Sequence, residues 1–264
     1  AERLNGSLEW LVKTLLDLHR DYELGDEKIM KGHGKVEGPS FVIGKSVYKA
    51  VILPPSITLS KTSFNLLQEY VNNGGKFIAL KPTPHLIDGK ESRELQKVLS
   101  KAHIIEDRDE EALSKALERV SPRVEISDAN GGKAQEVWYH LRQDGDQRIL
   151  FLANTSMERG FQTTVRLQGA GGVEEWSPFN GKVRMVPSRS EDGYAVFNLD
   201  FPPVGSHLIV LDPKKRAVAP KVKKAEKIRE VSLGDEWSYK RLDLNALTLD
   251  YGRVKLEDGE YGEL

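Results

Sequence analysis

Residues 50–55 read AVILPP, and residues 73–80 read NGGKFIAL. Each stretch holds four consecutive apolar residues, which is typical of a short strand that is buried on both faces of a sheet. The two prolines end the first strand, because proline cannot donate to a sheet ladder. Between the strands, Ser60 is expected to cap a helix that carries Phe64 and Leu67 on one face and ends at the glycines. The order strand, helix, strand predicts two parallel strands joined by a crossover helix.

The same alternation continues on both sides of this unit. Before it, leucines recur with helical spacing after Ser7, the expected N-cap, and residues 41–48 are predicted to form a hairpin. After it, two further amphipathic helices flank a short strand at residues 103–105. Alternating strands and helices predict a mostly parallel sheet with helices on its faces, which is a flavodoxin-like layer over residues 1–121.

From Val124 the apolar period changes from that of a helix to two, the period of a strand. The pair Asp144-Gly145 separates two apolar runs and is a strong hairpin signal, and Asn180-Gly181 supplies a second turn. Short strands with turns at roughly ten-residue spacing predict an antiparallel β-sandwich over residues 122–212. The expected fold class is therefore α/β plus all-β.

The rest of the chain is predicted to hold a connector and further strands. Residues 213–230 are rich in lysine and contain two prolines, so they are expected to be a linker. A nucleic-acid patch would also use lysines, but these lack interleaved aromatic residues, which favours a solvated connector. Residues 231–264 are predicted to open a further β domain or to pack as strands on the preceding ones, with Asp250 as a polar anchor.

Composition narrows the class of protein. The chain has 264 residues, a formal net charge of −1 and no cysteine. The near-neutral balance offers no footprint for a polyanion, and no apolar run approaches the about 18 residues that cross a bilayer. Without cysteine, disulfides, thiolate zinc sites and a cysteine nucleophile are excluded. Because the chain starts inside a helical pattern and stops soon after a strand-like run, we expect it to be an excised fragment.

Glycosidase chemistry would need two carboxylates that flank one bond. The candidate pairs are Asp26 with Glu27, expected at the end of a strand, and Glu174 with Glu175. Adjacent carboxylates in a strand point to opposite faces, which argues against either pair acting on one bond. For Asp26 and Glu27 we expect a solvated loop or a helix cap, and for Glu174 and Glu175 an exposed β surface. We predict no catalytic residue.

Other site chemistry is also absent from the sequence patterns. The six histidines are scattered without metal-ligand spacing, so no metal site is predicted. The glycine-rich stretches at residues 32–34 and 169–172 do not lie at a strand-to-helix turn, and no serine lies in a GxSxG elbow. We therefore expect no cofactor and no serine hydrolase.

Aromatic side chains are the remaining candidates, because sugars stack their C–H faces on aromatic rings. Most aromatic residues of a β-sandwich pack in its core, so core packing is the default interpretation. We retain Trp138 and Trp176 as candidate sugar platforms. The full set of candidate platforms is Trp138, Tyr139, Trp176, Phe179, Trp237 and Tyr239.

Several of the predicted strands and turns resemble a known arrangement of domains. Residues 47–55, with Leu59-Ser60 and residues 74–79, are similar to the class I glutamine-amidotransferase-like domain that follows the catalytic barrel in large glycoside hydrolases, including β-galactosidases and α-L-rhamnosidase-type enzymes. Asp26-Glu27 also fits the rhamnosidase-type pattern. Residues 149–154, 176–183 and 201–206 resemble the sandwich after that domain, and residues 245–251 resemble the start of the next one.

The resemblance implies an accessory, non-catalytic part of a bacterial glycoside hydrolase. The absence of cysteine leans towards a parent protein that is exported from the cytoplasm. In such enzymes the catalytic carboxylates lie in the barrel, which would precede Ala1 and be the main partner of this part. The α/β layer would brace the barrel or an oligomer interface. Amidotransferase activity is excluded, because it needs a cysteine. The alternatives are a carbohydrate-binding module, with Trp138, Trp176, Asp26 and Glu27 as candidate contacts, or a protein-interaction scaffold. No nucleic-acid or membrane partner is expected.

Overall fold

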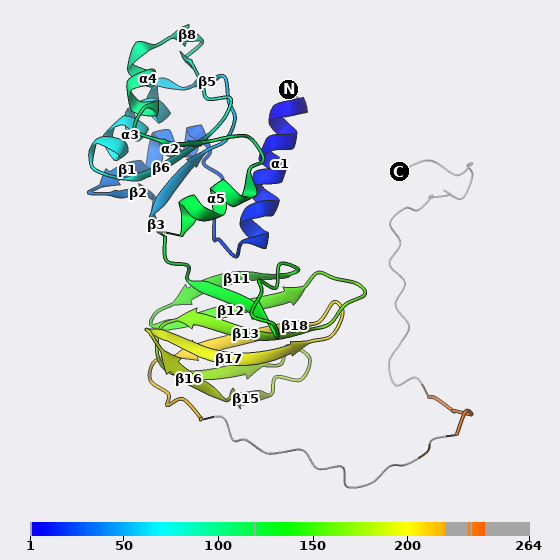
Figure 1. Ribbon diagram of the computed structural model, residues 1–264. Coiled ribbons are helices and arrows are strands. Elements are labelled where there is room, and N and C mark those ends of the chain that lie inside the picture. The colour runs from blue at the N-terminus through cyan, green and yellow to red at the C-terminus, as the bar shows by residue number, and fades with distance from the viewer. Residues whose placement is uncertain (1, 119, 220–231, 233, 241–264) are drawn as a thin grey trace, which may run out of the picture. The chain divides into compact units, whose positions relative to one another are not determined.

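A computed structural model describes residues 2–118, 120–219, 232 and 234–240 (Figure 1). A first compact unit runs through residue 221, and a second holds the residues from 222 onward. All helices and strands given below belong to the first unit. The predictions for Asp250 and for residues 245–251, and most of the predicted linker, lie outside the described residues.

The two quoted runs form neighbouring parallel strands, as predicted. Strand β4 (Ala50–Leu53) pairs with β6 (Lys76–Leu80), and β6 pairs with β9 (His103–Ile105), so the sheet order is β4-β6-β9 with all strands parallel. Helix α3 (Lys61–Asn72) makes the crossover, and Ser60 is its N-cap. We call this sheet and its helices the parallel layer.

The glycines after α3 have separate physical roles. Gly74 has a φ of +80°, a left-handed conformation that glycine adopts without steric cost. At Gly75, a β-carbon would lie only 2.3 Å from the ring of Tyr70. Tyr70 is fully buried, its hydroxyl donates to the Lys76 carbonyl at 3.0 Å, and burial raises its pKa to about 12. Gly75 is thus required for the close packing of Tyr70.

Helices cover both faces of the parallel sheet (Figure 1). Successive side chains of β6 contact the helices on one face and then those on the other. Phe77 and Ala79 pack with α3 and with α4 (Arg93–Leu99) on one face. Ile78 and Leu80 pack with α1 (Glu2–Asp17) and α5 (Glu110–Leu117) on the other. Successive strand side chains point to opposite faces, so a strand buried on both sides must be apolar throughout.

Smaller elements complete this half of the unit. Helix α2 (Glu27–His33) leads into the antiparallel strands β1 (Gly34–Glu37), β2 (Ser40–Ile43) and β3 (Ser46–Tyr48). The predicted hairpin over residues 41–48 is confirmed by the pairing of β2 with β3. A third small sheet has the order β5-β7-β8, where β5 is Thr58–Leu59, β7 is Leu86–Ile87 and β8 is Lys90–Glu91.

The residues from 124 onward form two antiparallel sheets, in agreement with the change of period. The four-stranded sheet has the order β10-β13-β17-β16, and the five-stranded sheet has the order β11-β12-β18-β14-β15. Their bounds are β10 (Val124–Asp128), β11 (Val137–Asp144), β12 (Gln147–Asn154), β13 (Phe161–Gln168), β14 (Gly172–Trp176), β15 (Val183–Val186), β16 (Ser188–Glu191), β17 (Tyr194–Phe201) and β18 (Ser206–Asp212). Asp144 pairs with Gln147 across the predicted first turn, and Gly181 has a φ of +67° in the second.

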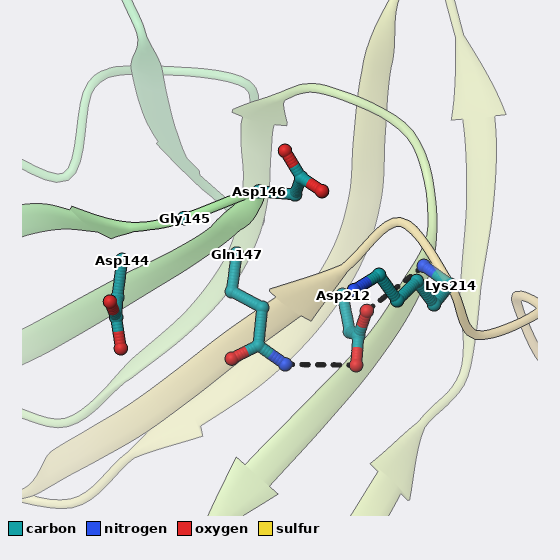
Figure 2. Close-up of a pocket in the computed structure, with 6 residues that line it drawn as sticks. All are labelled: Asp144, Gly145, Asp146, Gln147, Asp212 and Lys214. Carbon is teal, nitrogen blue, oxygen red and sulfur yellow. Dashed lines mark hydrogen bonds between the residues drawn. The ribbon is translucent and has the colours of Figure 1, made fainter.

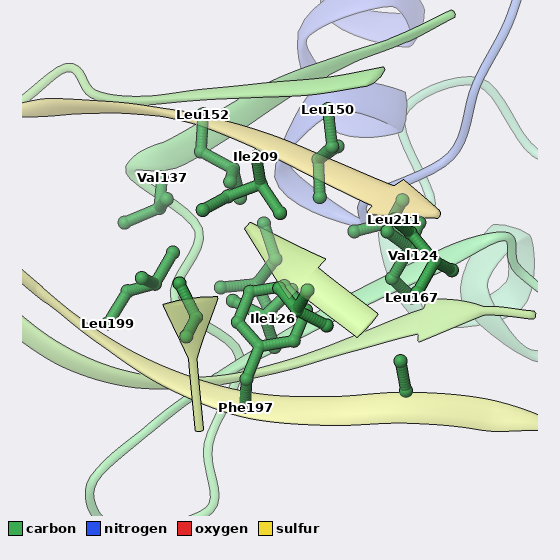
Figure 3. Close-up of a cluster of buried hydrophobic side chains, with 14 of the residues drawn as sticks. Val124, Ile126, Val137, Leu150, Leu152, Leu167, Phe197, Leu199, Ile209 and Leu211 are labelled. Atoms are coloured by element: carbon green, nitrogen blue, oxygen red, sulfur yellow. The ribbon is translucent and has the colours of Figure 1, made fainter. Parts of the chain in front are cut away.

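One hydrophobic cluster receives side chains from both antiparallel sheets (Figure 3). Phe197 of β17 and Leu167 of β13 come from the four-stranded sheet, and Leu152 of β12 and Ile209 of β18 come from the five-stranded sheet. Each of these residues is at most 2% exposed. Burial of each such side chain contributes roughly 1.5 to 3 kcal/mol, so this cluster is the main stabilising feature of the antiparallel half.

The expected start of the first helix at Ser7 was wrong. Ser7 is not an N-cap, because α1 already includes residues from Glu2 onward. The Ser7 side chain is fully buried, and its Oγ lies 3.0 Å from the Arg3 carbonyl oxygen and 2.7 Å from Asp107 Oδ2. A serine is tolerated within a helix when its hydroxyl bonds to the carbonyl four residues earlier.

Candidate functional site

Asp26 and Glu27 lie at the start of a helix, and the expected position at the end of a strand is wrong. Asp26 is the N-cap of α2, and its Oδ1 accepts hydrogen bonds from the backbone N–H groups of Lys28 at 2.8 Å and Ile29 at 3.0 Å. Glu27 Oε1 accepts from the backbone N–H of Ser60 at 3.0 Å. Both carboxylates therefore satisfy backbone donors at helix starts, one for α2 and one for α3.

The charge state of Glu27 fits this capping role. Desolvation raises the pKa of Glu27, but hydrogen bonds from Ser60 and Ser63 outweigh it, and the net pKa lies below its ordinary value. A glycosidase general acid needs the opposite shift, because it must carry a proton near neutral pH. The environment of Glu27 thus favours a structural carboxylate.

Glu174 and Glu175 differ from the prediction of an exposed β surface. Glu174 is only 5% exposed, accepts from Lys215 Nζ at 2.5 Å and accepts from Trp176 Nε1 at 3.1 Å. The hydrogen bond from Lys215 lowers the pKa of Glu174 and outweighs its desolvation. A carboxylate can be buried at this position because a lysine from after β18 neutralises it.

The two carboxylates do point to opposite faces, as expected for neighbours in β14. Glu175 Oε1 lies 2.6 Å from His207 Nδ1, and Glu175 Oε2 also pairs with Arg184. His207 Nε2 lies 3.1 Å from the Asp200 carbonyl oxygen, to which it can donate a hydrogen bond. Glu174 and Glu175 are therefore engaged in separate ion pairs and do not converge on one bond.

Trp176 belongs to a row of side chains across the outer face of the five-stranded sheet. Phe151 pairs with His140 of β11 and Leu208 of β18, and Trp176 pairs with Val183 of β15. Since Glu175 pairs with Ile209, the antiparallel register places Trp176 opposite Leu208. We call these residues, His140-Phe151-Leu208-Trp176-Val183, the aromatic row.

The aromatic row is exposed because its neighbours along each strand face the core. Leu150 and Leu152 are buried in the shared cluster, so Phe151 between them points outward. Phe151 is 44% exposed and Trp176 is 39% exposed. The indole N–H of Trp176 is held by Glu174, so the ring has a fixed orientation on this face.

The other aromatic candidates are placed differently. Trp138 is half-buried beside α1, and its Nε1 donates to Asp17 Oδ1 at 3.4 Å. Tyr139 packs against the core cluster, and Phe179 is almost fully exposed in the turn after β14. Trp237 and Tyr239 are exposed in the second unit. Only Trp176 of these tryptophans and tyrosines combines an exposed ring with a strand position and a fixed indole, among the residues described.

An open depression lies at the end of the five-stranded sheet, lined by Asp144, Gly145, Asp146, Gln147, Asp212 and Lys214 (Figure 2). Asp212 is buried and accepts from the Lys214 backbone N–H and from Gln147 Nε2, both at 2.9 Å. These hydrogen bonds lower the pKa of Asp212. In Figure 2 the side chains of Asp144 and Asp146 point in different directions. The sequence indicated a turn here and gave no signal for a depression, because Asp212 comes from a distant strand.

The described residues contain no group of three or more histidine, aspartate or glutamate side chains that could hold a metal ion. No helix in the described part of the chain has both the length and the hydrophobicity needed to cross a membrane.

Comparisons with known proteins find likeness in structure only. No protein-family model and no curated protein matches the chain. A rhamnosidase from Novosphingobium sp. PP1Y matches with a TM-score of 0.57 and 20% identity, over 77% of this chain and 21% of that one. An exo-carrageenase from Bacteroides ovatus gives a TM-score of 0.45 at 14% identity, over 77% and 26% of the two chains. An α-L-fucosidase from Paenibacillus thiaminolyticus gives 0.47 at 13%, over 79% and 45%.

These neighbours are glycoside hydrolases, and the chain spans only about a fifth of the rhamnosidase. At 20% identity, the match with the rhamnosidase shows a shared fold and no more. The chain therefore shares its fold with a part of a much longer glycoside hydrolase.

Proposed function

We propose that the chain is an accessory, non-catalytic part of a bacterial glycoside hydrolase, with a rhamnosidase-type parent that acts outside the cytoplasm on plant or bacterial glycans. The observation that carries the proposal is the shared fold over 77% of this chain and 21% of the rhamnosidase. In this proposal the parallel layer is the amidotransferase-like domain, residues 1–121, and the two antiparallel sheets are the β-sandwich, residues 122–212. Residues 213–230 are a linker to a further β domain in residues 231–264.

The hydrogen bonds and ion pairs of the candidate carboxylates support the proposal that this chain is non-catalytic. Asp26 and Glu27 cap helices, Glu174 is paired with Lys215, and Glu175 is paired with Arg184. A retaining or inverting glycosidase needs two carboxyl groups facing the same bond, one of them with a raised pKa. We infer that a barrel in the same polypeptide supplies both groups and that the parallel layer braces that barrel or an oligomer interface.

The test is hydrolysis of a panel of aryl glycosides that includes α-L-rhamnosides. We expect the purified chain to release no more aryl alcohol than a sample with the double substitution Asp26→Asn and Glu27→Gln. These substitutions keep the side-chain size while they remove both charges. Turnover by the unsubstituted chain that the double substitution abolishes would contradict the proposal.

The aromatic row favours a second candidate function, the binding of a glycan chain on the outer face of the five-stranded sheet. Phe151 and Trp176 stand on β12 and β14 with β18 between them, so their rings lie about two strand spacings, roughly 10 Å, apart. Rings on a flat face can each stack on the C–H face of a sugar. The hydrogen bond from Trp176 to Glu174 fixes one of them before any ligand arrives, which lowers the entropic cost of binding.

Titration with oligosaccharides while tryptophan fluorescence is followed tests this candidate. Saturable quenching that is weakened in Phe151→Ala, which keeps the Trp176 fluorophore, is the expected result. Phe179→Ala is the matched control, because Phe179 is exposed but lies in the turn between β14 and β15 and not on a strand of the five-stranded sheet. Flat curves across neutral and acidic oligosaccharides would contradict this candidate function.

A further inference from the structure

The end of α1 is built around a histidine in an unusual backbone conformation. The backbone N–H of Arg20 donates to the Leu15 carbonyl at 2.8 Å, and that of His19 donates to the Leu16 carbonyl at 3.0 Å. This is the hydrogen-bond pattern of a helix end that closes through a left-handed residue, a position usually occupied by glycine. Here His19 occupies it with a φ of 53°.

The His19 side chain reaches from α1 to the antiparallel half of the unit. Its Nε2 lies 3.1 Å from the carbonyl oxygen of Ala134 and 3.1 Å from that of Val137. Both oxygens are acceptors, so Nε2 must carry the proton. The residue is only 4% exposed. The steric penalty of a β-carbon in the left-handed region is thus accompanied by a buried contact that glycine could not make.

Three neighbouring contacts join the same two regions. The Tyr139 hydroxyl donates to the His19 carbonyl at 3.4 Å, and Trp138 Nε1 donates to Asp17 Oδ1 at 3.4 Å. Arg20 Nη1 donates to the Val120 carbonyl at 2.5 Å. Each of these bonds links the end of α1 to β11 or to the segment that precedes the antiparallel sheets.

The opposite side of this joint is fixed to the parallel layer. Leu11, Leu15 and Leu18 of α1 and its C-terminal turn are buried in the cluster that contains Ile78 and Leu80 of β6. Helix α1 therefore contributes to the core of the parallel layer through its apolar face and contacts β11 through its C-terminal turn. A displacement of one half relative to the other would therefore have to break either this core or the polar joint.

We propose that His19 is a latch that fastens the parallel layer to the five-stranded sheet, so that the two halves open and unfold as one unit. The latch consists of the His19 ring and its two acceptor carbonyls, with Tyr139, Trp138 and Arg20 as supporting contacts. Its role in holding the accessory part rigid within a larger protein rests on the proposed function. The coupling of the two halves is independent of the aromatic row, since none of these residues belongs to that row.

The test compares His19→Gly with the unsubstituted full chain. Glycine keeps the left-handed turn and removes only the ring, so α1 can still end at the same place. In calorimetry, the unsubstituted chain should show one unfolding transition for the first unit, and His19→Gly should show two. His103→Ala is the matched control, because His103 is exposed on β9. Two transitions in the unsubstituted chain, or one transition in a folded His19→Gly, would contradict the proposal that His19 couples the two halves.

A milder pair of variants covers the case in which His19→Gly does not fold. Tyr139→Phe and Trp138→Phe remove one supporting donor each and keep the aromatic rings. Hydrogen exchange measured by mass spectrometry should be about tenfold faster in β11 of the double variant, while β17 in the four-stranded sheet keeps its rate. Equal acceleration of both strands, or no acceleration of either, would overturn the proposal.

Discussion

The parallel layer and the five-stranded sheet solve the burial of a sheet in different ways. The parallel sheet is covered by helices on both faces, and its central strand β6 is apolar and buried at four successive positions, residues 77–80. The five-stranded sheet packs one face on the shared core and leaves Phe151 and Trp176 exposed on the other. A layer that is covered on both faces is suited to a bracing role, whereas an open aromatic face is available for a ligand. This difference in coverage places any glycan contact of the proposed function on the antiparallel half.

The largest effects should come from the two cores. Phe64→Ala in the parallel layer and Phe197→Ala in the antiparallel half each empty a site that is at most 2% exposed. Each should lower the free energy of unfolding by about 3 to 5 kcal/mol. Urea denaturation checks this. If the halves are coupled, each substitution shifts the transition of the whole unit, and a shift confined to one half would separate them.

A smaller effect is expected at the buried carboxylate of the antiparallel half. Lys215→Met leaves Glu174 without its ion-pair partner, which should cost about 1 to 3 kcal/mol, reduced from the buried-pair range because Lys215 is partly solvated. Urea denaturation measures the loss, and Lys214→Met is the adjacent control.

The same site predicts a pH dependence with a defined sign. The pKa of Glu174 is lowered in the folded chain, so its contribution to stability is present above the ordinary carboxyl value of 4.5 and is lost as pH falls through the lowered pKa. Lys215→Met should flatten this part of the stability curve. An unchanged curve would show that the ion pair makes no net contribution.

The capping carboxylate of Asp26, which precedes the parallel layer, should contribute less to stability than the Glu174 ion pair. Asp26→Ala removes the N-cap of α2 and should cost about 1 kcal/mol, because two backbone donors lose their acceptor. Asp26→Asn keeps an acceptor oxygen and should cost less. Thermal unfolding of the two variants gives the difference. Equal losses would mean that the charge of Asp26, and not its capping oxygen, is what stabilises the helix.

The smallest expected effect is the loss of stability at low pH that arises from His19, at the junction of the two halves. Desolvation lowers the pKa of His19, with Lys133 acting in the same direction and Asp17 and the bonded carbonyls opposing it. Because the unfolded chain binds the proton more readily, stability should be full above 6.5 and decline as pH falls below it. The Tm of the first transition, measured from pH 8 to pH 5, should fall less in His19→Gly, which lacks this group. An identical slope in both chains would assign the decline to other residues.

How far the sequence predicted these features depends on the range of the interactions involved. The parallel strands were predictable, because burial on both faces leaves an uninterrupted apolar run such as residues 77–80. The hairpin at Asp144-Gly145 was predictable because glycine supplies the positive φ of the turn, here +54°. Both signals are local in the sequence.

The candidate site was less predictable, because its partners are distant in sequence. Glu174 is buried only because Lys215 lies beside it, and Glu27 caps a helix through Ser60. The aromatic row required the register of five strands, which no single strand specifies. His19 gave no signal, since a left-handed histidine at a helix end differs from the usual glycine.

The most direct test of the central claim is the sequence of the complete open reading frame that encodes these 264 residues. The account predicts that a barrel domain, with two carboxylates at the ends of its strands, is encoded upstream in the same frame. An open reading frame that encodes these residues without such a barrel would contradict the assignment to a glycoside hydrolase.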